Sequence, residues 1–91
     1  MKKISTPKLS KSGTKVKVKW TNISGETGYQ ISKSSSKSKT SIVSTYKTTS
    51  GTYKTVSATK GKTYYYKVRA YIVVDGAKVY GPWSSVKAYK R

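Results

Sequence analysis

The chain has 91 residues, with 20 Lys and Arg side chains against two Asp and Glu, and a formal net charge of +18 at pH 7. This length predicts one domain, and no stretch is apolar enough over sufficient length to span a bilayer. The absence of His and Cys removes the commonest acid–base group, the commonest strong nucleophile, disulfides and thiolate metal sites. The two carboxylates, Glu26 and Asp75, lie in separate turn-like segments, which argues against glycoside hydrolysis and hard-cation binding. We therefore expect no catalysis, cofactor or metal.

Alternation of apolar and polar residues predicts strands in the first half of the chain. Residues 15–20 alternate without a break, which places Val16, Val18 and Trp20 inward. Residues 29–32 alternate in the same way after a Gly-containing turn. The segment 32–50 consists almost entirely of Ser, Lys and Thr, so its composition fits disorder as well as a short edge strand around residues 40–46. The regular strands on either side favour the edge strand.

The second half predicts a long strand, a hairpin and a final strand. The long strand covers residues 64–71 and has an inward face of Tyr64, Tyr66, Val68 and Ala70 and an outward face of Tyr65, Lys67, Arg69 and Tyr71. Asp75-Gly76 is a strong hairpin signal. The final strand covers residues 85–89, with Val86 and Ala88 inward and Lys87 and Tyr89 outward. Seven short strands separated by turns predict an all-β, two-sheet antiparallel sandwich without helices.

Several motifs, in this order, resemble a fibronectin type III domain over residues 7–89. They are Trp20 closing an alternating strand, Gly28-Tyr29-Gln30-Ile31, the run from Gly61 to Tyr71, and Tyr80-Gly81-Pro82-Trp83-Ser84. The form they resemble is the accessory module of bacterial and phage extracellular proteins. The resemblance implies a seven-stranded immunoglobulin-like sandwich over residues 7–91, preceded by a disordered segment 1–6.

The resemblance also implies roles for individual residues. Trp20 would be the core tryptophan, and Tyr64 would be the tyrosine of the sheet corner, with its hydroxyl bonded to nearby backbone. The family usually has a leucine where this chain has Ala58, so we expect a thinner core there unless Val56 compensates. The chain contains no Arg-Gly-Asp, so integrin binding is not implied.

One outward face interleaves aromatic and basic residues and is the candidate ligand-binding surface. Tyrosine rings stack on sugars or bases, while Lys and Arg contact phosphates or carboxylates. The candidate residues are Tyr65, Lys67, Arg69, Tyr71, Lys87 and Tyr89, with Arg91 extending the row. The same pattern also suits an exposed sheet face that has no ligand, because tyrosine is a strong strand former. A second basic row, Lys15, Lys17 and Lys19, lies on the opposite sheet and favours diffuse attraction over one defined site.

Charge and resemblance together favour a non-catalytic accessory or spacer module of a larger extracellular, cell-wall-associated or phage structural protein. Its expected partners are flanking domains of the same chain and an anionic cell-wall polymer or polysaccharide, and we expect a monomer. Two alternatives remain open at this stage. One is non-specific nucleic-acid binding, which the charge favours although no recognition element accompanies it. The other is a structural spacer that binds nothing.

Overall fold

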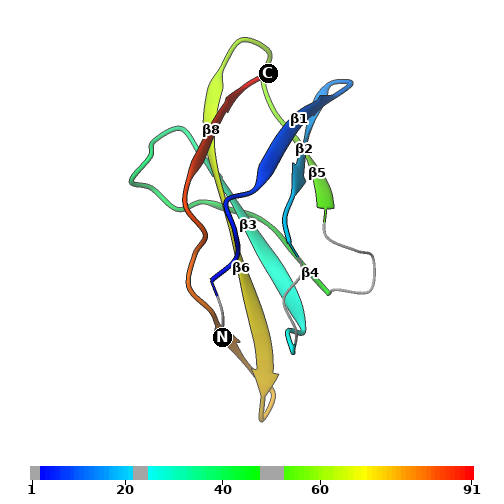
Figure 1. Cartoon of the computed structure of the whole chain (residues 1–91), viewed down its shortest axis with the longest axis vertical. Helices are drawn as coiled ribbons and strands as arrows, with labels where there is room; N and C mark the ends of the chain where they lie inside the picture. The colour runs from blue at the N-terminus through cyan, green and yellow to red at the C-terminus, as the bar shows by residue number, and fades with distance from the viewer. Residues whose placement is uncertain (1–2, 22–24, 48–52) are drawn as a thin grey trace.

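The structure is a computed structural model that describes residues 3–21, 25–47 and 53–91. These residues form eight strands in two antiparallel sheets (Figure 1). The three-stranded sheet has the order β1-β2-β5 and consists of β1 (Lys8–Ser12), β2 (Lys15–Lys19) and β5 (Tyr53–Ser57). No helix in the described part of the chain is long and apolar enough to cross a membrane.

The second sheet is larger and is built around the long central strand β6. Its order is β4-β3-β6-β7, with β8 also paired to β6. Its strands are β3 (Gly28–Ser34), β4 (Ile42–Lys47), β6 (Thr63–Val74), β7 (Ala77–Tyr80) and β8 (Lys87–Lys90). The β6–β7 hairpin extends beyond the end of the three-stranded sheet (Figure 1). It turns at Asp75 and Gly76, both with positive φ, as the Asp-Gly signal predicts. The all-β sandwich is confirmed.

Strands β7 and β8 are two halves of one interrupted strand. Both pair with β6, β7 opposite its second half and β8 opposite its first half. Pro82 lies between them and has no N–H to donate to a ladder. The chain still follows β6 through this break, because the Ser84 N–H donates to the Val68 carbonyl at 2.8 Å and the Ser84 hydroxyl accepts from the Val68 N–H at 2.9 Å. Because the strand beside β6 is divided at Pro82 into β7 and β8, the structure has eight strands where seven were predicted.

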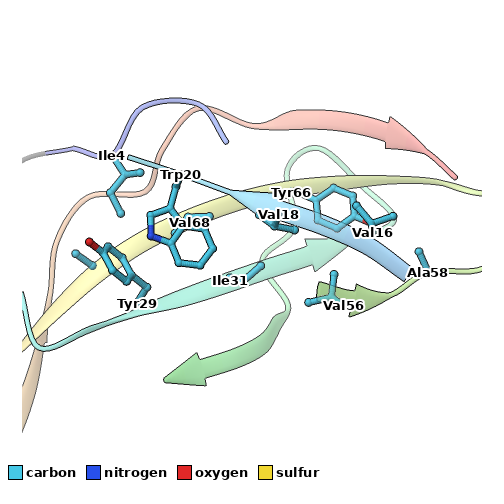
Figure 2. Close-up of a cluster of buried hydrophobic side chains, with 11 residues drawn as sticks. Ile4, Val16, Val18, Trp20, Tyr29, Ile31, Val56, Ala58, Tyr66 and Val68 are labelled. Carbon is cyan, nitrogen blue, oxygen red and sulfur yellow. The ribbon is translucent and has the colours of Figure 1, made fainter. Parts of the chain in front are cut away.

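The core lies between the two sheets and is filled from both (Figure 2). The rings of Trp20 and Tyr29 pack at 5.1 Å between centroids and a tilt of 57°. The alternation predicted for β2 and β6 is confirmed by the buried residues. Ile4, which falls within the segment expected to be disordered, is 1% exposed and belongs to this core. The core residues are Ile4, Val16, Val18, Trp20, Tyr29, Ile31, Val56, Ala58, Tyr66, Val68 and Ala70.

Two details refine what the resemblance implies. Ala58 is part of the core, beside the buried Val56, which pairs with Val16 across the β2–β5 ladder. Tyr64 is half-buried, and its hydroxyl donates to Oγ1 of Thr59 at 3.3 Å, so its partner in the structure is a side-chain hydroxyl. This hydrogen bond, with smaller contributions from nearby lysines, lowers the pKa of Tyr64.

Tyr66 carries a buried hydroxyl without a hydrogen-bond partner among the described residues. Burial raises the pKa of Tyr66 to about 12. Between pH 10 and 12 the folded tyrosine therefore keeps a proton that the unfolded chain has lost, so the free energy of unfolding falls as pH rises through this window. Two pKa units correspond to about 2–3 kcal/mol.

We expect Tyr66→Phe to be as stable as the parent at neutral pH, or about 1 kcal/mol more stable, because it removes an unpaired buried hydroxyl. It should also lose less stability than the parent between pH 10 and 12, whereas lysine titration affects both proteins alike. Denaturant unfolding at both pH values measures this. Destabilisation of Tyr66→Phe at neutral pH, or equal alkaline losses, would contradict the assignment.

Candidate functional site

The outer face of β6 and β7 carries an arginine held between two aromatic rings. The guanidinium carbon of Arg69 lies 3.9 Å from the ring centroid of Tyr80 and 4.4 Å from that of Trp83. Its Nε donates to Oε1 of the buried Gln30 at 2.9 Å, and Gln30 is the residue opposite Arg69 on β3. Arg69 is therefore fixed by the fold in both position and orientation.

The neighbouring groups on this face also contact one another. Nζ of Lys67 donates to Oγ1 of Thr40 at 2.6 Å and lies 5.0 Å from the centroid of Trp83. Tyr71 is 3% exposed and packs against Tyr80 at 6.3 Å between ring centroids. The ammonium of Lys78 is 5.6 Å from the Tyr71 centroid. The domain's own cations lie against Tyr71, Tyr80 and Trp83, so a ligand that stacks on these rings would compete with them, although Tyr80 is 42% exposed.

Four of the six predicted site residues share one face, and two do not join them. Tyr65, Lys67, Arg69 and Tyr71 alternate along the outer face of β6 as predicted. The predicted position of Lys87 and Tyr89 on this face is wrong, because Tyr89 pairs with Tyr64 and Lys87 with Tyr66, and paired residues share a face.

The break at Pro82 does not cause this error, because even-numbered residues face outward in β7 as well as in β8. The error comes from the apolar pattern of the last strand, which placed Ala88 inward, whereas its pairing with Tyr65 places it on the outer face. Tyr89 packs against the core, and Ala88 is exposed. Arg91 does not extend the row either, since its guanidinium donates to the carbonyl of Thr14 in the turn between β1 and β2.

Residues 35–41 are tied by hydrogen bonds to the neighbouring strand β3. The hydroxyl of Ser34 donates to the carbonyls of Ser36 and Lys39, and the N–H of Ser41 donates to the hydroxyl of Ser32. Both Ser32 and Ser34 are buried. The edge strand expected around residues 40–46 is present as β4 (Ile42–Lys47), while residues 48–50 lie outside the described part of the chain.

The outer face of the three-stranded sheet is the second basic surface, and we call it the lysine face. On β2 it carries the predicted row Lys15, Lys17 and Lys19, since Val16 and Val18 point inward. Lys8 on β1 lies opposite Lys19, and Tyr53 on β5 flanks Lys19 from the other side. Lys8 and Tyr53 were not predicted to belong to this surface, because neither β1 nor β5 has a clear alternation. In β1, the apolar Leu9 was the one residue of the sequence that indicated which way its neighbour Lys8 points.

A pocket of about 140 Å³ lies at one end of the lysine face. It forms where the chain enters β1 and leaves β2. Two lysines, three hydroxyl residues and the core tryptophan line it, namely Ser5, Thr6, Lys8, Lys19, Trp20 and Thr21. Neither acid of the chain is in this sheet, and within the described residues there is no group of His, Cys, Asp or Glu side chains suited to a metal ion.

Comparison with known proteins identifies the fold. No protein-family model and no curated protein sequence matches the chain. Among solved structures, it is similar to the solution structure of the sixth fibronectin type III domain of human fibronectin type III domain containing protein 3. The TM-score is 0.70 at 22% sequence identity, over 98% of this chain and 83% of that one. The chain thus has the two-sheet, immunoglobulin-like sandwich fold of a fibronectin type III domain.

Proposed function

We propose that this domain is a non-catalytic module of a larger extracellular or cell-wall-associated protein, and that it adds electrostatic affinity for anionic polymers of a cell surface. The observation that carries the proposal is the charge balance of 20 basic against two acidic side chains. The net charge of +18 already counts both carboxylates, so it is the charge that a polyanion meets. A charge of this size attracts polyanions and accelerates their association.

The structure bears on which kinds of polymer fit. Stacking of sugar rings or bases requires exposed aromatic faces. On the outer face of β6 and β7, Arg69 already lies against the rings of Tyr80 and Trp83. The lysine face presents the exposed Lys8, Lys15 and Lys19 on an extended surface, while the ammonium of Lys17 lies against the ring of Tyr53. Charge contacts with a polymer backbone therefore account better for binding than carbohydrate stacking on the face selected from the sequence.

The test is binding of the isolated domain to purified anionic cell-wall polymer over a range of salt concentrations. About five charge contacts would lower the affinity roughly 100-fold between about 50 and 200 mM salt, because each contact releases counterions from the polymer. A neutral polysaccharide of similar length is the control and should not bind. Absence of binding at the lowest salt, or binding that does not weaken as salt rises, would contradict the proposal.

A further inference from the structure

The lysine face places its ammonium groups in a regular array. Alternate residues of a strand point to the same side, at a spacing of about 6–7 Å. Lys15, Lys17 and Lys19 form one such row, and Lys8 stands opposite Lys19 on the adjacent strand. A flat basic row of this kind can follow the backbone of a linear polymer that carries an anion on each unit.

The Lys8–Lys19 pair is the most informative part of this array. Like charges directly opposite each other on neighbouring strands destabilise a sheet. Lys8 and Lys19 are both exposed, and neither acid of the chain lies in β1, β2 or β5. An anion bound between the two ammonium groups would remove this repulsion.

The pocket at this pair supplies further donors. Lys8 and Lys19 line it together with Ser5, Thr6 and Thr21, whose side chains each carry a hydroxyl. A phosphate group offers several strong acceptor oxygens, and lysine binds phosphate as a compact point charge. Ammonium groups combined with hydroxyls therefore suit a phosphate.

The lysine face has little to offer to nucleic-acid bases. Within β1, β2 and β5, Tyr53 is the aromatic residue of this face. The ammonium of Lys17 lies 4.3 Å from the centroid of its ring. Binding of single-stranded nucleic acid draws much of its affinity from stacking of bases on open aromatic rings. Tyr53 is 50% exposed and offers at most one ring to a base, whereas a phosphate polymer without bases needs no ring at all.

From these features we infer that the lysine face binds a linear phosphodiester polymer without bases, with one phosphate group seated in the pocket between Lys8 and Lys19. This inference rests on the proposed function and assigns it a surface and a ligand class. The remaining lysines of the row contact neighbouring phosphates along the polymer.

The test compares two double variants that each remove two positive charges. Lys8→Gln/Lys19→Gln alters the pocket, whereas Lys37→Gln/Lys90→Gln alters two exposed lysines outside the lysine face. The probe is poly(glycerol phosphate), with titration by calorimetry across salt concentrations. We expect the pocket variant to lose about tenfold in affinity and to lower the salt slope by about two, and the control variant to lose less than about threefold. The pocket variant should also be at least as stable as the parent, because it removes a repulsive pair.

Each of the other possible results would overturn a different part of the proposal. Equal losses in both variants would overturn the site and leave the electrostatic function standing. Absence of binding by the parent domain would overturn the function itself. An oligothymidylate of the same number of phosphates should bind no more tightly than poly(glycerol phosphate), because the lysine face offers its bases little stacking. Tighter binding of the oligothymidylate would overturn the polymer class in favour of nucleic acid.

Discussion

Replacement of Trp20 by alanine is expected to lower the free energy of unfolding by about 3–5 kcal/mol, the range for removal of a large buried aromatic side chain. Trp20 is 4% exposed and packs against Tyr29, which is fully buried. The loss is a large fraction of the total stability of a small domain, roughly 5–15 kcal/mol. We expect the variant to unfold at a much lower denaturant concentration, or to be unfolded at room temperature. Far-UV circular dichroism measures this without relying on tryptophan fluorescence.

The second tryptophan of the chain is a matched control. Trp83 is half-buried on the outer face, where it contacts the cationic groups of Lys67 and Arg69. Trp83→Ala removes two cation–π contacts and should cost about 1–2 kcal/mol. Equal losses for the two alanine variants would contradict the placement of one tryptophan in the core and the other on the surface.

Arg69→Ala has the second largest expected effect, a loss of about 2–3 kcal/mol. The variant removes a charge-assisted hydrogen bond to Gln30 and two stacking contacts, with Tyr80 and Trp83. It also deletes the half-buried stem of the arginine, which packs along the sheet. The removal of one positive charge from a strongly basic domain opposes this loss only slightly, since charges at the surface are screened. Thermal and denaturant unfolding at moderate salt measure the net effect.

Arg69→Lys separates charge from shape. Lysine keeps the positive charge but lacks the planar guanidinium that lies between two rings while Nε donates to Gln30. We therefore expect it to recover less than half of the loss. Lys78→Ala, a change to the more distant cation beside Tyr71, should alter stability by less than about 0.5 kcal/mol. Full recovery by lysine would show that charge alone is needed at this position.

The inward faces of β2 and β6 could be predicted from sequence because burial of one face imposes strict alternation. Val16 and Val18 on β2, and Val68 and Ala70 on β6, lie where the pattern places them. The hairpin could be predicted equally well, since Asp-Gly is among the few residue pairs that adopt positive φ readily, and Asp75 and Gly76 both do so.

The candidate surface was only partly predictable. The sequence signals the turn at Asp75-Gly76 but does not indicate that the following strand β7 places Tyr80 against Arg69 and Tyr71. Nor does it show that β8 pairs with β6 in a register that places Tyr89 opposite the inward Tyr64. Both features depend on pairing between strands, which alternation within one strand does not encode.

The outer faces of the two sheets differ in what their cationic side chains contact. On the larger sheet, Lys67 and Arg69 are engaged by aromatic rings and by polar side chains of the domain itself. On the three-stranded sheet, Lys8 and Lys19 face each other beside a pocket.

The most direct test of this account is a titration of the isotope-labelled domain with poly(glycerol phosphate), followed by NMR at near-physiological salt. We expect chemical shifts to change along the lysine face, at Lys8 and Lys19 most strongly. The signals of Lys67 and Arg69 on the opposite sheet should move little. Changes of similar size on both sheets, or changes centred on Arg69, would contradict it.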